Sequence, residues 1–429
     1  MTQNVTPVEA FVADFEAVNG LLAGNDLPWL SSLRRSGIEQ FSGQGLPHAK
    51  LEAWKYTRLR PLEDTSFRPV NDADGSAGVA SIPAVLPSDS SHPRIVFVNG
   101  TLRLDLSWLD ALPDGVSIES LGQVIASDPE WVGAHLGRIG RLDGQPLTAL
   151  NTAMMNCGCV IRVRRGVVVE APIEVIYVAG LTDSPVAYHP RNLIVMEENS
   201  QATIVKLHAG LGVGAYFANA VTEVEVGDGA TLRHYRVQSE NRESTHLANL
   251  NVRIGKDATY DGFGLHLGGR LSRTDVFARL EGEGGHCGLN GAYLMKGREH
   301  CDTTTVIEHH AAHTTCREIF KGILDDEARG VFQGKIIVHP GAQQIDGHQL
   351  SNALLLSDRA EMDAKPELEI YADDVKCSHG ATTGKLDDTS LFYLRSRGIP
   401  EALARNLLIQ SFLAEVIDEV KDEAVREAL

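Results

Sequence analysis

Two stretches decide the fold: VEVGDGATL (residues 224–232) and VRIGKDATY (residues 252–260). Each starts with a short alternating apolar run, turns at Gly and Asp, and carries an Ala-Thr pair. The same pair stands in MEENSQATI (residues 196–204), so it recurs at equal intervals, at 202/203, 230/231 and 258/259. A fixed interval between short β-rich runs predicts a β-solenoid, in which each coil stacks on the one before it.

The repeat leaves the shape of the coil open. A period of about 28 residues fits one broad coil, or two flattened coils of about 14 residues, each with two strands of about five residues. Further equal steps reach small or polar residues at 286/287, 314/315 and 342/343, where the motif itself is lost. A β-sandwich with accidental spacing is the alternative architecture.

Other patterns flank this β-rich core. Residues 1–148 are predicted to form a mostly helical N-terminal region with a β-hairpin near 94–106, which turns at an Asn-Gly pair. The β-helix core is predicted over residues 149–395, where helical periodicity nearly vanishes. Residues 396–429 are predicted to form a C-terminal helical domain.

The C-terminal segment has one apolar face. Pro400 is well placed to start a helix, and Leu403, Leu407, Phe412 and Val416 recur along it at near-helical spacing. A helix of this kind can cover the open end of a solenoid, as such folds require. Its surface can instead dock a partner, although composition alone favours the covering role.

The composition excludes several classes of protein. The 429 residues include 39 Lys and Arg against 57 Asp and Glu, so the net charge is −18, which argues against nucleic-acid binding and a polybasic membrane anchor. The sequence has neither an apolar run of membrane-spanning length nor the pattern of a secretion signal. The six cysteines form no dense disulfide framework, so we expect a cytoplasmic protein.

Cys377-Ser378-His379 carries the clearest chemistry. On a strand, residues i and i+2 point to the same side, so thiol and imidazole would lie side by side. The pair can bind iron or zinc, or act as nucleophile and base. A buried cysteine beside a hydrogen-bonded histidine is the simpler alternative. Because two ligands do not complete a metal site, a partner chain would have to supply the others.

Residues 300–316 hold a second group of potential metal ligands. Strand alternation would place Glu308, His310 and Cys316 on one face, and His309 with His313 on the other. A zinc site and polar residues that line the solenoid turns are both compatible with this pattern. The sequence lacks the P-loop, dinucleotide-binding and nucleophile-elbow motifs.

The segment from Ile336 to Arg397 resembles the SufB/SufD family of iron–sulfur cluster assembly proteins. The pieces KPELEIYADDVKCSHGAT and LFYLRSRGI resemble its SufD branch, and LPHAKLEAWKYT (residues 46–57) is similar to a SufD segment. The cysteine and glutamate arrangement of the SufB branch is not found here. The resemblance covers both ends of the chain, while residues 210–283 carry little of it.

The resemblance implies a mainly β fold, with a right-handed parallel β-helix core flanked by N-terminal and C-terminal helical regions. It implies a non-catalytic scaffold subunit of the ATP-dependent SUF complex, which takes part in iron acquisition and cluster formation at a subunit interface. A SufB-like subunit would pair with the β-helix. A SufC-like ABC ATPase would bind the C-terminal helical region, which makes Leu403, Leu407, Phe412 and Val416 candidate contacts.

The family's Cys and His in CSHGAT fall on Cys377 and His379. The resemblance implies that His379, and secondly Cys377, bind iron or an iron–sulfur cluster at the partner interface, transiently and shared with that partner. Asp373 and Asp374 would attract iron. We expect no catalytic residue, no tightly bound cofactor on the isolated chain, and no nucleic-acid or membrane partner.

Three further possibilities follow from the pattern. The isolated chain can form a homodimer through an exposed solenoid edge. A β-solenoid carbohydrate-active enzyme is one alternative function, although an aromatic content of 6% is poor for stacking on sugars. A zinc-binding structural protein that uses residues 300–316 is another.

Overall fold

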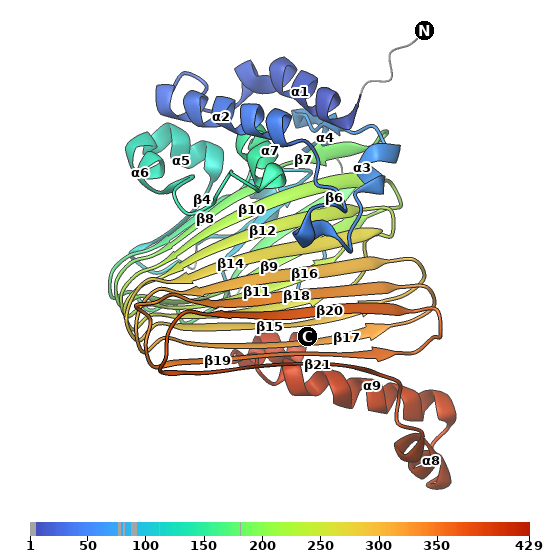
Figure 1. The fold of residues 1–429 in the computed structure, drawn as a ribbon. Helices are drawn as coiled ribbons and strands as arrows, with labels where there is room; N and C mark the ends of the chain where they lie inside the picture. Colours follow the sequence, from blue (N-terminus) through green and yellow to red (C-terminus); the bar gives the residue numbers. More distant parts are fainter. Residues whose placement is uncertain (1–5, 76–78, 80–81, 87–91, 111, 181) are drawn as a thin grey trace.

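The computed structural model describes residues 6–429 except 76–78, 80–81, 87–91, 111 and 181. It is mainly β: a β-solenoid of about seven turns carries helices at both ends of the chain. Figure 1 shows the two sheets stacked face to face, with successive coils running from the N-terminal helices down to β20 and β21. The β-solenoid prediction is therefore confirmed.

Two largely parallel sheets form the solenoid, and we call them sheet A and sheet B. Sheet A contains β4 (Val116–Ser120), β5 (Cys159–Val163), β8 (Arg191–Met196), β10 (Tyr216–Val226), β12 (Thr245–Ile254), β14 (Leu271–Leu280), β16 (His300–His309), β18 (Arg329–Val338) and β20 (Glu361–Ile370). In addition, β7 (Val186–Tyr188) pairs with β10, and β1 (Arg68–Pro69) pairs with β7. Sheet B contains β3 (Thr101–Leu102), β2 (Arg94–Val98), β6 (Ile173–Gly180), β9 (Gln201–Leu211), β11 (Thr231–Ser239), β13 (Thr259–His266), β15 (His286–Met295), β17 (Thr315–Leu324), β19 (Ile345–Leu355) and β21 (Val375–Gly384).

Each coil is one broad turn with a strand in each sheet, so the flattened half-length coil and the β-sandwich are both wrong. The register of β11 with β13 pairs Thr231 with Thr259, which is the interval seen in the sequence. The interval varies elsewhere, because Thr245 pairs with Leu271 but Arg329 pairs with Glu361. The copy at 196–204 is out of register, since Ala202 lies opposite Leu232 instead of Ala230.

One backbone position per coil turns the chain from sheet A into sheet B. Its residue adopts a positive φ, between 52° and 74°, and its N–H donates to a carbonyl of the next coil. The following residue is buried inside the corner, and Ala230 and Ala258 are fully buried there. The Gly, Asp and Asn of the repeat are thus corner residues, which tolerate this conformation best. From β8 onwards, the corner residues are Asn199, Gly229, Asp257, Gly284, His313 and Gln344.

The N-terminal helices cover the first coils (Figure 1). The predicted hairpin is confirmed: β2 and β3 pair antiparallel around Asn99 and Gly100, and β2 extends sheet B. Glu223 of β10 is fully buried against Arg191 and accepts backbone N–H bonds from Gly137, Ile139 and Gly140, which ties this region to the solenoid. The helices are α1 (Pro7–Val18), α2 (Pro28–Gln44), α3 (Arg60–Asp64), α4 (Asp72–Gly75), α5 (Leu121–Ser127), α6 (Pro129–His135) and α7 (Pro146–Met154), with short 3-10 turns at Asn19–Leu21, Glu52–Trp54 and Leu104–Leu106.

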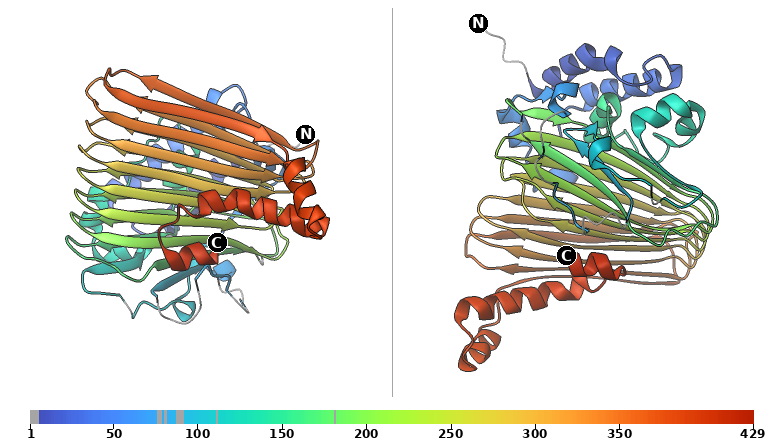
Figure 2. Two further views of the ribbon diagram at one scale, coloured as in Figure 1. Left: turned by 90° about the horizontal axis from the view of Figure 1, so that it is seen from below. Right: turned by 180° about the vertical axis from the view of Figure 1, so that it is seen from behind.

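The C-terminal helices are α8 (Asp388–Ser396), α9 (Glu401–Ile417) and α10 (Glu423–Ala428). Pro400 precedes α9, as predicted. The covering role at the open end is wrong, because α9 packs on the outer face of sheet B against β15 and β17. Figure 2 shows α9 lying alongside the strands of sheet B, while α8 projects beyond them. Among the described residues, no helix has both the length and the apolar character to span a bilayer.

The interior between the sheets contains polar as well as apolar side chains. Burial raises the pKa of Glu318 on β17 to about 7 and lowers the pKa of Lys206 on β9 to about 7. Glu318 accepts a hydrogen bond of 2.6 Å from the side chain of Gln349 on β19. Glu318 therefore holds its proton at pH values where an exposed glutamate has lost it.

We predict that Glu318→Gln changes how stability depends on pH. Between the ordinary pKa of 4.5 and the raised value near 7, the folded chain binds a proton that the unfolded chain releases. Protonated Glu318 therefore contributes to the free energy of unfolding. This contribution is complete below pH 4.5 and is lost as the pH rises towards 7, which lowers the free energy of unfolding by up to about 3 kcal/mol. Urea unfolding midpoints should fall less in the variant than in the wild type between pH 5 and pH 8. Glu361→Gln, at an exposed glutamate of β20, is the control, and parallel profiles for Glu318→Gln and wild type would contradict this.

Candidate functional site

The open end of the solenoid carries the Cys-His pair found in the sequence. β21 pairs with β19 and with no other strand in the described part of the chain. Cys377 lies opposite Gly347, and His379 lies opposite the buried Gln349. Both residues share the inward side of the strand. Because no described coil covers them, Cys377 is half-buried and His379 is exposed.

Gly347 brings two thiols close together. A Cβ atom at this position would lie 3.4 Å from the Cys377 Sγ and 3.3 Å from the Cys316 Sγ. Burial raises the pKa of the Cys377 thiol, so the free thiol keeps its proton at neutral pH. A thiophilic metal can displace that proton, since thiolate is the form that binds metal.

The three thiols of Cys287, Cys316 and Cys377 form a column that ends at the open end. The strand registers place Cys287 opposite Cys316, Cys316 opposite Gly347 and Gly347 opposite Cys377. Burial raises the pKa values of Cys287 and Cys316 well above the ordinary value. No periodic signal in the sequence marks this column, because the intervals between its successive positions, Cys287, Cys316, Gly347 and Cys377, all differ.

Asp373 and Asp374 lie in the turn before β21, outside the strand that carries the pair. Asp374 and His379 are separated along an extended strand by about 16 Å. That distance exceeds the screening length of about 8 Å at physiological ionic strength. The two carboxylates therefore do little to attract a cation to His379.

The potential metal ligands within residues 300–316 point to opposite sides of the corner at His313. His309 points inward, and its Nε2 lies 3.2 Å from the Cys316 Sγ. Glu308 points outward into a groove on sheet A, and His310 contacts Glu308. The prediction that Cys316 shares a face with Glu308 and His310 is wrong, because the positive φ of His313 interrupts the strand alternation.

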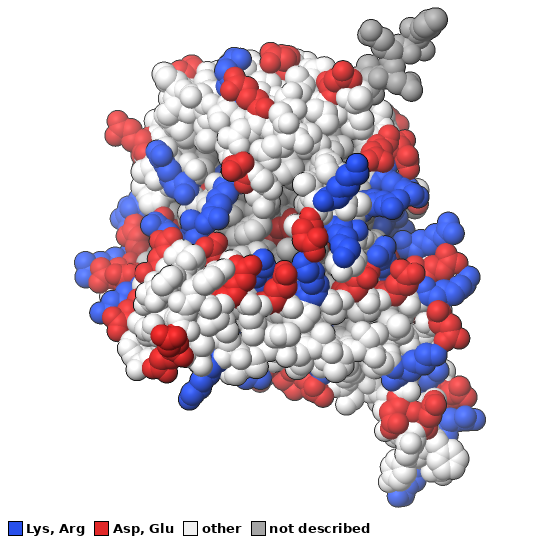
Figure 3. All heavy atoms as spheres, in the orientation of Figure 1, with Lys and Arg blue, Asp and Glu red and all other residues white. Residues whose placement is uncertain are grey.

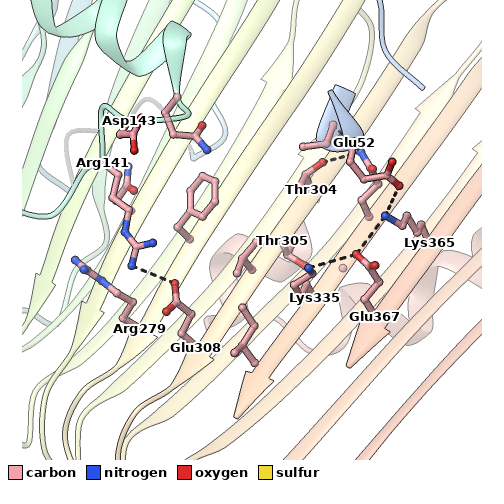
Figure 4. A pocket seen from close by; sticks show the side chains of 18 of the residues that line it. Glu52, Arg141, Asp143, Arg279, Thr304, Thr305, Glu308, Lys335, Lys365 and Glu367 are labelled. Atoms are coloured by element: carbon pink, nitrogen blue, oxygen red, sulfur yellow. Dashed lines mark hydrogen bonds and ion pairs between the residues drawn. The ribbon is translucent and has the colours of Figure 1, made fainter. Parts of the chain in front are cut away.

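A groove of about 400 Å³ crosses the outer face of sheet A beneath the N-terminal region. Figure 4 shows Arg141 reaching Glu308 at one end, and Lys335, Glu367, Lys365 and Glu52 linked in a chain at the other. Phe277 is the only aromatic residue among its described lining residues. A sugar-cleaving solenoid would be expected to offer aromatic surfaces for stacking, so the groove does not favour the carbohydrate-active alternative.

Charge is distributed unevenly over this face of the molecule. Figure 3 shows acidic and basic side chains gathered around the groove and at the ends of the strands. The band below them, towards the open end, is largely uncharged in the same view. A largely uncharged band suits protein–protein contact better than the binding of a charged small molecule.

The four apolar residues predicted on the C-terminal helix differ in exposure. Leu403 and Leu407 are 50% and 39% exposed, whereas Val416 is fully buried against sheet B. Phe412 packs against the same sheet and lies under the Lys321 ammonium, 4.5 Å from the ring centre. A partner that docks on the folded chain can therefore reach Leu403 and Leu407, but not Val416.

Comparisons with known proteins agree with this architecture. Residues 179–412 match the family model described as SUF system FeS cluster assembly, SufBD core domain, and residues 6–175 match the SufBD protein N-terminal region. The chain is 32% identical to the iron–sulfur cluster assembly protein SufD of Escherichia coli, over 91% of this chain and 89% of that protein.

Two further relatives cover nearly the whole chain. An iron–sulfur cluster assembly SufBD family protein of Synechocystis is 31% identical over 93% of this chain and 89% of its own length. SufD of Bacillus subtilis is 27% identical over 94% of this chain and 92% of its own length. The chain therefore belongs to the SufB/SufD family, in its SufD branch, and has a role in iron–sulfur cluster assembly.

Proposed function

We propose that the chain is a non-catalytic scaffold subunit of a cytoplasmic SUF complex, which pairs with a SufB-like subunit at its open end and with a SufC-like ATPase at its C-terminal helices. The observation that carries the proposal is the inward-facing pair of Cys377 and His379 on a terminal strand. Iron or a nascent cluster is the cargo at this place, and the chain helps to acquire the iron.

The edge of the last coil supports pairing with another solenoid. The terminal strands β20 and β21 are long, with 10 residues in each, and long unpaired edges invite further strands. Ile370 at the end of β20 is 39% exposed, and Leu368 and Val375 are only partly covered. A SufB-like chain that continues the stack would cover these side chains. A second copy of this chain would use the same edge when no partner is present.

The donor set supports iron as cargo. Thiolate and imidazole are both ligands of iron. The Cys377 thiol packs against the apolar interior and hydrogen-bonds with the backbone of Gly347, and the exposed His379 imidazole lies where a partner can reach it. Two donors hold a metal incompletely, so residues from the partner would finish the coordination. A site divided between two chains releases its cargo when the chains separate, which suits transient assembly.

The C-terminal helices support docking of an ATPase. Phe392 and Tyr393 on α8 are 72% and 56% exposed, and Leu403 and Leu407 extend the apolar surface onto α9. We call this surface the arm patch. Because α8 begins shortly after β21 ends, force applied to the arm patch acts on the strand that carries Cys377 and His379.

We predict that His379→Ala abolishes most cluster assembly by the complex without dissociating it, because the exposed imidazole is lost while the strand remains. Cys377→Ala should have a smaller effect. The measurement is complementation of a strain that lacks this chain, together with iron and sulfide content of the purified complex. His348→Ala removes an exposed imidazole from the outward side of β19 and should have little effect. Full activity of both site variants would refute the assignment.

We predict that Ile370→Asp prevents pairing at the open end, because an ionised side chain would have to be buried in the contact. Recovery of the SufB-like subunit on the tagged chain should fall about tenfold or more. Val213→Asp, at an 88% exposed valine between β9 and β10, is the matched control. Equal recovery with both variants would show that the partner binds elsewhere.

We predict that Leu403→Glu combined with Leu407→Glu releases the ATPase but keeps the SufB-like subunit, because the arm patch and the open end are different surfaces. Pull-down with the tagged chain measures both partners in one experiment. Leu21→Glu, at an 85% exposed leucine of the N-terminal region, should retain both. Retention of the ATPase by the double variant would exclude this docking surface.

A further inference from the structure

A cluster of three potential metal ligands lies on the outer side of a corner: Glu308, His310 and His339. The inward-facing thiols lie on the opposite side and do not contact it. Glu308 belongs to β16, His310 follows β16 directly, and His339 follows β18. The register pairs His309 with Val338, so the two outward histidines occupy the same position in consecutive coils. Their rings stack with centres 4.0 Å apart and an interplanar angle of 17°.

Both imidazoles aim the same atom at one carboxylate oxygen. The Nε2 atoms of His310 and His339 lie 3.2 Å and 3.3 Å from the Glu308 Oε2. All three donor atoms lie within 4.8 Å of one another. Arg141 approaches the other oxygen of Glu308, Oε1, at 3.4 Å (Figure 4), which leaves Oε2 to the histidines.

These separations match those between ligands of one metal ion. Donors bound at about 2.0–2.1 Å in a tetrahedral arrangement lie about 3.3 Å apart. Two imidazole nitrogens and one carboxylate oxygen form a donor set that selects first-row transition metals over magnesium and calcium. The side chains of His310 and His339 are each 36% exposed and that of Glu308 is 12% exposed, so solvent can complete the coordination.

The charge state of His310 suits the same role. Burial and the neighbouring His339 lower the pKa of His310, so its imidazole is neutral at pH 7 and keeps a lone pair for a metal. Two stacked imidazolium rings would repel each other at this distance. A cation bound between Glu308 and the two rings would instead offset the carboxylate charge without protonating either histidine.

We propose that Glu308, His310 and His339 bind a divalent first-row transition metal ion, such as Fe²⁺ or Zn²⁺, through Oε2 and the two Nε2 atoms. The proposal is independent of the function proposed above, because it involves neither Cys377 nor His379. The competing interpretation is that Glu308 only accepts hydrogen bonds from two histidines, with no ion involved.

The test uses the full chain with Cys377→Ala and His379→Ala, so that the open end contributes no metal ligands. Titration with Co²⁺ and Zn²⁺ should reveal one bound equivalent. Bound Co²⁺ should show d–d absorption without the charge-transfer band of a thiolate ligand. His310→Ala, His339→Ala and Glu308→Gln should each weaken binding about tenfold or more. His313→Ala, which removes an exposed histidine from the same corner, should bind as well as its parent.

Thermal unfolding provides a second readout. The shift in Tm caused by Zn²⁺ is measured within each variant, so a change in Tm caused by the substitution itself does not affect it. Zn²⁺ should raise the Tm of the parent and of His313→Ala, because an ion that binds only the folded chain stabilises it. It should not raise the Tm of His310→Ala or His339→Ala. Equal Zn²⁺ binding by all variants, or no binding by the parent at micromolar metal, would overturn the proposal and leave Glu308 as a shared hydrogen-bond acceptor.

Discussion

One backbone corner per coil is the constraint on which this structure depends. At that corner the chain passes from sheet A to sheet B through a residue with positive φ, whose N–H donates to the next coil. A long side chain can occupy the position, as His313 and Gln344 do, but Gly, Asn and Asp occupy it at lower cost. Each corner bond fixes the offset between two coils, and these offsets decide which side chains lie above one another in the interior.

The sequence motif was informative because it records the corner. GDGAT and GKDAT place a left-handed residue and then a small one that fits inside the turn, so the solenoid could be predicted. The Asn99-Gly100 pair likewise made the hairpin predictable. The register could not, since turns absorb or release residues and the interval between paired positions changes from coil to coil. The thiol column and the contact of His310 with His339 depend on that register and carry no periodic signal of their own.

The C-terminal helix illustrates a different limit. Of the four apolar residues that its spacing predicted on one face, Val416 is buried whereas Leu403 and Leu407 are exposed, because an amphipathic pattern does not identify the surface that covers it. The outer face of sheet B presents Val237 and Phe263, which need cover along the flank of the solenoid, and the helix packs there. As a consequence, the helix leaves the edge of the terminal coil uncovered. That edge is the feature by which a solenoid can join another protein.

The corner at residues 309–314 also connects the two groups of potential metal ligands. His309 turns inward to Cys316, and His310 turns outward to Glu308 and His339. An ion held by His310 and His339 would link two consecutive coils on the outside of this corner. The spacing of these two coils also sets the position of Cys316 opposite Gly347. The two sites are chemically separate, yet the same backbone bonds position both.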